Sequence, residues 1–300
     1  MTKSLVTLDH ISCFFAHKEV LKDLSLNVHE GEAMAIVGNN GTGKSTLLKI
    51  ISGLGAINGG RRIEAPEDKR LSIGFAPDRF PKLRFTATEY LRYMGRIRGM
   101  NKQRLEERIS DLMSQLRLDP TIRQQLRNYS KGMLQKVNLM QALLEKPDLL
   151  LLDEPLSGLD MRTQEELMNV LIQIKRQGMT IVLTTHEKVM MEQIADRVVE
   201  LADGGIASDK RVPVYATIVK EIIFDLGENE MRQCLSDGEG VRTWSRLNTH
   251  WRVEISADNS DAFLRSILQA GAAIIKVISL PESPTLGAMV PVKTEKVVVV

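Results

Sequence analysis

One short segment restricts the fold of this chain more than any other feature of the sequence. Residues 38–46 read Gly-Asn-Asn-Gly-Thr-Gly-Lys-Ser-Thr, which satisfies the pattern G-x-x-x-x-G-K-[ST]. The apolar run 33–37 precedes this segment, and helix-forming residues follow from Ser45 until Gly53. A strand, a glycine loop and a helix in this order predict a loop whose backbone N–H groups surround phosphate oxygens.

The residue types of this loop suit a nucleotide and its metal ion. Lys44 is long enough to reach the β- and γ-phosphates of ATP, and the Ser45 hydroxyl is a ligand type for Mg²⁺. The alternative is an ordinary glycine-rich turn between a strand and a helix. In such a turn, packing would not require a Lys-Ser pair at these positions. The residues predicted to contact the nucleotide are Gly38, Asn39, Asn40, Gly41, Thr42, Gly43, Lys44, Ser45 and Thr46.

A second segment ends on two carboxylates. The apolar run 149–152 is unbroken, as in strands covered by helices on both faces, and Asp153 and Glu154 follow it directly. Because the carboxyl ends of parallel strands meet at one edge of a sheet, we expect Asp153 beside the glycine loop as a Mg²⁺ ligand. Glu154 is then the candidate general base for an attacking water. The alternative is a pair of solvated acids after a strand.

Strand and helix signals alternate around these segments. Apolar residues at helical spacing over 161–176 are followed by Gly178 and by the apolar strand 180–184. Repeated units of this kind predict an α/β fold with a parallel, doubly wound core sheet. Residues 4–15 and 20–28 read as antiparallel strands separated by a turn at Ala16, His17 and Lys18, and residues of about 85–145 read as a helical subdomain.

The pattern changes after Asp203-Gly204-Gly205. A strand near 251–255, a helix over about 258–270 and a strand near 273–279 predict a small α+β module. We therefore expect two domains, 1–210 and 211–300, and a frayed tail or edge strand at 293–300.

Charge and composition exclude several classes of protein. The formal charge of +2 excludes strong attraction of the whole molecule to nucleic acid, and no apolar run is long enough to cross a bilayer. Cys13 and Cys234 are too few for a disulfide framework, so we expect a reducing compartment. Positive charge is concentrated in residues 78–136, with fourteen Lys and Arg against six Asp and Glu. This segment is either a face held against anionic lipid or a solvated helical surface.

The motifs occur in an order that resembles the nucleotide-binding subunits of ATP-binding-cassette (ABC) transporters, over roughly residues 5–205. Residues 129–136 (Tyr-Ser-Lys-Gly-Met-Leu-Gln-Lys) resemble the signature motif of that family, and 155–160 (Pro-Leu-Ser-Gly-Leu-Asp) resemble its proline and D-loop. His186 matches the switch histidine, Phe15 an adenine-stacking aromatic, and Asp78 the Q-loop position. The resemblance implies a P-loop NTPase of ABC type, with a parallel core sheet, an antiparallel β subdomain and a helical subdomain.

The resemblance also implies roles for these residues. His186 would contact the γ-phosphate and orient Glu154, Asp78 would approach Mg²⁺, and Asp160 would belong to the D-loop. The signature residues, which would bind the γ-phosphate held by another subunit, are Ser130, Lys131, Gly132 and Met133. Simpler interpretations remain open: a helix cap at Ser130, a structural His186, and a core position for Phe15.

Two residues depart from the family pattern. Asp78 stands where Gln is usual, and its side chain is one methylene shorter, so contact with Mg²⁺ through water or after a loop movement is expected. Lys131 replaces the first glycine of the signature pair and adds a cation. The Ser-Lys-Gly signature with an acid in the Q-loop resembles the drug- and antibiotic-resistance branch of the exporters.

The function implied by this resemblance is an ATPase subunit that forms a homodimer, or pairs with a similar subunit, around two ATP and Mg²⁺. Hydrolysis would power transport, in the direction of export, through a separate transmembrane permease. The chain would then be cytoplasmic and peripheral on the inner face of the cell membrane, with no nucleic-acid partner. The alternative is a soluble ABC ATPase that acts on nucleic acid or ribosomes. The module at 211–300 would be accessory.

Overall fold

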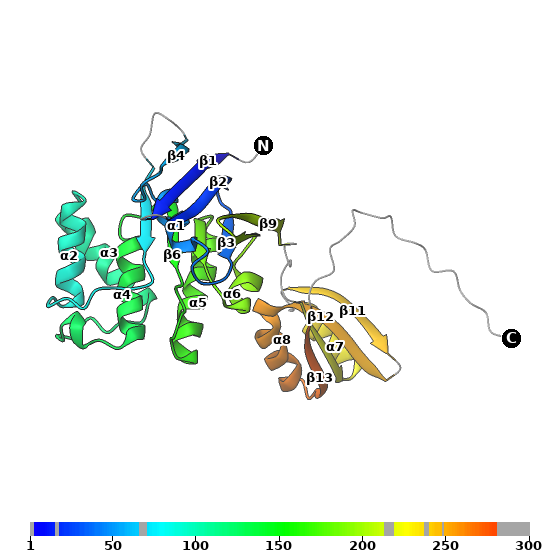
Figure 1. Cartoon of the computed structure of the whole chain (residues 1–300). Coiled ribbons are helices and arrows are strands. Elements are labelled where there is room, and N and C mark those ends of the chain that lie inside the picture. The colour runs from blue at the N-terminus through cyan, green and yellow to red at the C-terminus, as the bar shows by residue number, and fades with distance from the viewer. Residues whose placement is uncertain are drawn as a thin grey trace. The chain divides into compact units, whose positions relative to one another are not determined.

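A computed structural model describes residues 3–15, 18–65, 71–212, 219–236, 240–247 and 249–280. The chain divides into two compact units, Met1–Val212 and Pro213–Val300 (Figure 1). The predicted turn residues Ala16 and His17 and the predicted tail 293–300 lie outside the described residues. Lys18, expected in that turn, instead begins the second strand.

The first unit is built around a sheet of six strands in the order β5-β6-β7-β3-β8-β9. The first five of these are parallel, and β9 pairs antiparallel with β8 at one edge. The predicted doubly wound sheet is therefore confirmed, with an antiparallel edge strand added. The strands are β3 (Ala33–Val37), β5 (Ile73–Ala76), β6 (Leu149–Asp153), β7 (Thr180–Thr184), β8 (Arg197–Ala202) and β9 (Gly205–Arg211).

Strands β6 and β7 are buried along their whole length, which explains why both are apolar runs without alternation. They are adjacent and parallel, and Asp153 at the end of β6 pairs in register with Thr184 at the end of β7. Strand β3 is the other neighbour of β7 and ends just before the glycine loop. Three chain segments with polar residues therefore reach the same edge of the sheet.

Helices follow these strands in the first unit. Helix α1 (Lys44–Ile51) begins directly after the glycine loop and buries Leu47, Leu48, Ile50 and Ile51. Helix α5 (Met161–Arg176) follows β6 and buries one apolar stripe, and the short α6 (Lys188–Gln193) follows β7. A separate antiparallel sheet has the order β2-β1-β4, formed by β2 (Lys18–His29), β1 (Ser4–Phe15) and β4 (Gly59–Glu64).

The predicted helical subdomain consists of α2 (Ala87–Ile97), α3 (Lys102–Gln115) and α4 (Lys131–Leu143), with a 3₁₀ turn at Leu126–Asn128. These three helices lie together on one side of the first unit (Figure 1). Each begins at a side-chain cap, with Thr86 and Glu89 forming a capping box on α2, Asn101 capping α3 and Ser130 capping α4. None of the helices among the described residues is long and apolar enough to cross a bilayer.

The second unit has the element order β-α-β-β-α-β: β10 (Val219–Asp225), α7 (Glu228–Ser236), β11 (Val241–Leu247), β12 (His250–Ser256), α8 (Ala257–Gln269) and β13 (Ala273–Leu280). Its antiparallel sheet has the order β11-β12-β10-β13, which is a split β-α-β arrangement. Residues of both helices share one apolar core with Phe224 and Trp251, so both helices cover the same face. Strands β10 and β13 are neighbours, and Val219 pairs with Leu280. The elements β10, α7 and β11 were not predicted.

Candidate nucleotide-binding site

The glycine loop between β3 and α1 is held against the core so closely that one of its positions excludes a side chain. Gly38 has φ +142°, and a Cβ atom there would lie 2.4 Å from the carbonyl oxygen of Leu201 on β8. Gly43 has a left-handed conformation and is the residue from which α1 begins. The loop therefore turns directly from the end of β3 into the amino terminus of a helix, which favours an anion.

Lys44 is drawn back into this loop. Lys44 as a whole is 7% exposed, and its ammonium donates hydrogen bonds to the carbonyl oxygens of Gly38 (2.7 Å) and Asn39 (3.1 Å). The same Nζ lies 3.2 Å from Nε2 of His186. The cation is thus fixed at the mouth of the loop by two backbone carbonyl groups. Such a charge is available for a phosphate.

A chain of hydrogen bonds connects α1, β6 and β7. The Ser45 hydroxyl donates to Oδ1 of Asp153 (3.1 Å), and the Thr184 hydroxyl donates to the same oxygen (2.7 Å). The backbone N–H of Glu154 donates in turn to Thr184 Oγ1 (2.9 Å). Thr184 therefore fixes both the buried Asp153 carboxylate and the backbone from which Glu154 projects.

Glu154 is a constrained and partly desolvated acid. Its φ is +48°, a conformation that non-glycine residues adopt rarely, and its side chain is 18% exposed. Its Oε1 lies 3.1 Å from Nε2 of His186. Burial raises the pKa of this carboxyl above its ordinary value; His186 and Lys44 oppose the increase, whereas the like charge of Asp153 adds to it.

One cavity of about 310 Å³ brings nine of the predicted site residues together. It is lined by Val20, Asn40, Gly41, Gly43, Lys44, Ser45, Thr46, Asp78, Asp153 and Glu154. His186 joins this set through its contacts with Lys44 and Glu154. Phe15 does not line the cavity and is 80% exposed, so its interpretation as a core residue is wrong.

The signature residues and Asp160 also lie outside the lining of this cavity. Ser130 caps α4, because its hydroxyl accepts a hydrogen bond from the backbone N–H of Met133 (3.2 Å). Asp160 caps α5 in the same way, through the backbone N–H of Thr163 (3.0 Å). The capping interpretation of Ser130 therefore describes its state in a single chain, where it meets no nucleotide loop.

Comparisons with known proteins agree with this geometry. A family model described as "ABC transporter" matches residues 21–157. The uncharacterized ABC transporter ATP-binding protein sll0415 of Synechocystis is 38% identical over 62% of the chain, and the matched segment spans only 55% of that protein. The uncharacterized ABC transporter ATP-binding protein YxlF of Bacillus subtilis is 33% identical over 68% of this chain and 70% of its own length. The chain belongs to the ABC transporter family.

Two further similarities extend the description of this ABC protein. The linearmycin resistance ATP-binding protein LnrL of Bacillus subtilis is 26% identical over 92% of this chain and 93% of its own length. A solved dimeric structure of the ATP-binding cassette MJ0796, bound to ADP and Pi after hydrolysis, matches with a TM-score of 0.63 and 25% identity. It covers 70% of this chain and 99% of the solved chain. The first unit therefore has the ABC ATPase fold, and the protein binds and hydrolyses ATP.

The residues of this ABC site fit Mg²⁺ in their chemistry. Mg²⁺ prefers oxygen ligands, and the Ser45 hydroxyl and the Asp153 carboxylate already lie within hydrogen-bonding distance of each other. Asp78 lines the same cavity. A carboxylate that is held by two hydroxyl donors can exchange one of them for a cation without moving its backbone.

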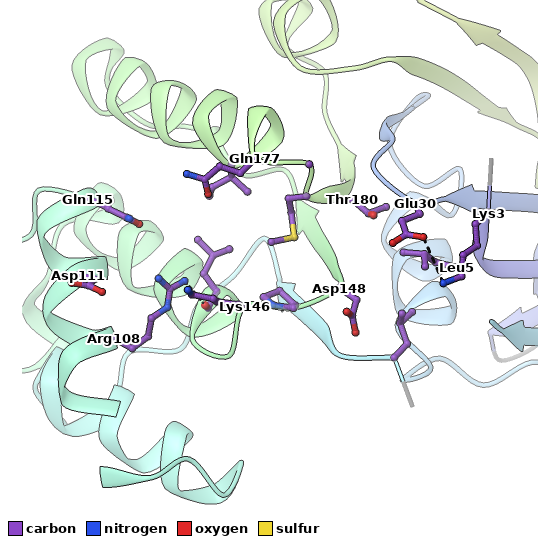
Figure 2. A pocket seen from close by; sticks show the side chains of 16 residues that line it. Lys3, Leu5, Glu30, Arg108, Asp111, Gln115, Lys146, Asp148, Gln177 and Thr180 are labelled. Carbon is purple, nitrogen blue, oxygen red and sulfur yellow. Dashed lines mark hydrogen bonds and ion pairs between the residues drawn. The ribbon is translucent and has the colours of Figure 1, made fainter. Parts of the chain in front are cut away.

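A larger cavity, of about 590 Å³, lies at the opposite edge of the core sheet, where β6 and β7 begin (Figure 2). Its lining contains Arg108, Lys146 and Thr180 but none of the residues predicted for chemistry. Arg108 donates from Nη2 to the carbonyl oxygen of Leu143 (2.9 Å) at the carboxyl end of α4. One nitrogen of this guanidinium thus binds a free carbonyl oxygen at a helix end.

Sequence reasoning missed two residues of the ABC site. Thr184 was counted only as part of a strand, although it holds Asp153 and Glu154 in place. A hydroxyl residue that ends an apolar strand next to the carboxylate strand was the available signal. Val20 lines the nucleotide cavity from β2, and no signal in its local sequence distinguishes it from an ordinary strand residue.

Proposed function

We propose that two copies of this chain enclose two ATP molecules, each held between the glycine loop of one copy and the signature residues of the other. One observation carries the proposal: Lys44, Ser45 and Glu154 converge on one cavity, and no signature residue lines it. The dimeric form of the similar MJ0796 cassette supports the pairing of two chains. Hydrolysis would remove the γ-phosphate contacts and shift the population toward separate chains.

Within each composite site, the residues of this chain would have separate tasks. Lys44 and the loop amides would bind the β- and γ-phosphates, and Phe15 would stack on adenine from its exposed position. Ser45, Asp153 and Asp78 would hold Mg²⁺, which neutralises phosphate charge when bound. Glu154 would accept a proton from the attacking water, and its raised pKa makes it a stronger base. His186 would orient that carboxylate.

A separate membrane subunit would dock on the helical subdomain. Three large apolar side chains project from this region: Phe85 (41% exposed), Tyr93 (50%) and Ile97 (79%). The rings of Phe85 and Tyr93 contact each other at 5.3 Å, so they form one surface. This docking would place the chain on the inner face of the membrane, where the positive charge of residues 78–136 suits anionic headgroups.

The direction of transport is proposed to be export, as part of drug or antibiotic resistance. The similarity to LnrL, a linearmycin resistance protein, supports this because it includes most of the second unit as well as the ATPase unit. Domain 211–300 would be an accessory module that the ATPase chemistry does not need.

The dimer proposal is tested by blocking the signature position. Ser130→Phe should keep ATP binding at the glycine loop but abolish both turnover and nucleotide-dependent dimerisation, because a large ring would occupy the place of the partner's γ-phosphate. Loss of the helix cap alone is controlled by Asn101→Ala, which removes the equivalent cap of α3. Normal ATP turnover by the Ser130→Phe protein would contradict a shared site.

A further inference from the structure

The helix that begins at the signature motif and the helix that begins at the D-loop are packed against each other at their amino ends. At Gly132 on α4, a Cβ atom would lie 2.8 Å from Cγ2 of Thr163 on α5. The Lys131 ammonium lies so close to the D-loop that a Cβ on Gly158 would come within 2.6 Å of its Nζ. The two motifs are therefore in direct contact within a single chain.

One turn further along, an ion pair joins the same two helices. The ammonium of Lys136 lies 2.6 Å from Oε2 of Glu166, and these side chains are only 10% and 17% exposed. Lys136 holds the pKa of Glu166 below its ordinary value, and Arg162 adds a weaker contact at 3.3 Å. A charge-assisted hydrogen bond between largely buried groups restrains both helices in rotation and in sliding.

The D-loop then leads back to Glu154 through backbone hydrogen bonds. The N–H of Ser157 donates to the carbonyl oxygen of Glu154 (3.1 Å), and the N–H of Leu159 donates to that of Leu156 (3.3 Å). Gln164 on α5 donates from its side chain to the same Leu156 oxygen (3.3 Å). The segment between Glu154 and α5 is thus a chain of tight turns fastened to the helix.

We propose that Lys136, through Glu166, is a positioning residue that joins the signature end of α4, the D-loop and α5 into one rigid unit. A phosphate bound to Ser130 from the partner's nucleotide would then set the position of Glu154 in this chain. This inference rests on the proposed dimer, in which each chain lends its signature to the other nucleotide. The ion pair makes occupation of one ATP site act on hydrolysis in the second.

The test uses mixed dimers of full-length chains with two different affinity tags. One chain, the silent chain, carries Glu154→Gln, so turnover is counted only at the site of the other, the hydrolysing chain. That site combines Glu154 of the hydrolysing chain with Ser130 of the silent chain. Lys136→Met is introduced into one chain at a time, and hydrolysis of radiolabelled ATP is measured after tandem capture.

We expect Lys136→Met in the hydrolysing chain to reduce turnover about fivefold or more, because it disconnects Glu154 from the other nucleotide. The same change in the silent chain should alter turnover less than about twofold. Lys136→Arg in the hydrolysing chain should restore most of the rate, since it keeps the charge. Lys175→Met is the matched control, because Lys175 makes an ion pair of the same length with Asp196 at the other end of α5.

Two results would overturn the inference. Equal losses from both placements would show that Lys136 only stabilises the fold, and a larger loss from the silent chain would show that it only shapes the signature for the partner's phosphate. Failure of the unsubstituted chains to form mixed dimers with ATP would instead contradict the proposed dimer itself.

Discussion

The ammonium of Lys44 lies 3.2 Å from Nε2 of His186, although α1 and the segment after β7 are far apart in the sequence. The same imidazole nitrogen lies 3.1 Å from a carboxylate oxygen of Glu154. One histidine therefore bridges the cation expected to bind the phosphates and the acid expected to accept the proton. A γ-phosphate entering the loop would compete with His186 for the Lys44 ammonium.

Replacement of Lys44 by Met should weaken ATP binding about 10- to 100-fold, because a charge-assisted contact to phosphate is lost while the aliphatic stem remains. Titration with a fluorescent ATP analogue measures this change. Lys49→Met provides the control, since Lys49 is an exposed residue on the same helix. Equal affinities of the two variants would show that the loop lysine does not bind the nucleotide.

Glu154→Gln should lower kcat about 10²- to 10⁴-fold, the range expected for loss of a general base. Binding of ATP should persist, and sedimentation should show a stable dimer at saturating ATP. The exposed Glu165 offers a control, and Glu165→Gln should hydrolyse ATP normally. A Glu154→Gln chain that stays monomeric with ATP would argue against trapping of the closed form.

The raised pKa of Glu154 predicts the direction of the pH dependence. Only the ionised carboxylate accepts a proton, so kcat/KM should decrease as the pH falls, with a midpoint above the ordinary Glu value of 4.5. Asp78→Asn removes a like charge and should move this midpoint to lower pH. His186→Gln removes a stabilising partner and should move it to higher pH. Rate profiles over a pH series measure all three midpoints.

Gly38→Ala should lower the free energy of unfolding by about 2 kcal/mol or more, because its Cβ would collide with a backbone carbonyl. Gly41→Ala should cost only about 1 kcal/mol, since Gly41 has a positive φ but no atom within 4 Å of an added Cβ. Urea denaturation without nucleotide compares the two variants. The prediction fails if both lose the same stability.

The elements around the ATPase site could be predicted because each carries its own local signal. The bounds of β3, α5 and β7 match the predicted ranges 33–37, 161–176 and 180–184. In these segments an apolar run stops at a glycine or at a polar residue, and helical spacing begins after a capping residue. In these three elements, most of the residues that the local sequence pattern marks as apolar are also residues that the folded unit buries.

Other features depend on contacts that no local pattern records. Strand β10 alternates imperfectly because Glu221 is buried on it through an ion pair with Arg252 of β12, so its sequence does not read as a half-buried strand. The bridge from Lys44 through His186 to Glu154 joins three segments that meet only after the sheet is assembled. The helix cap at Ser130 was one of the interpretations left open, whereas the capping role of Asp160 was not predicted beside its motif role.

The pairing of Val219 with Leu280 means that the second unit enters and leaves its fold at adjoining points of neighbouring strands. A module with adjoining ends can be spliced into a host chain, or removed from it, with a short linker in its place. The β-α-β-β-α-β unit is therefore suited to insertion into other proteins as a separate domain.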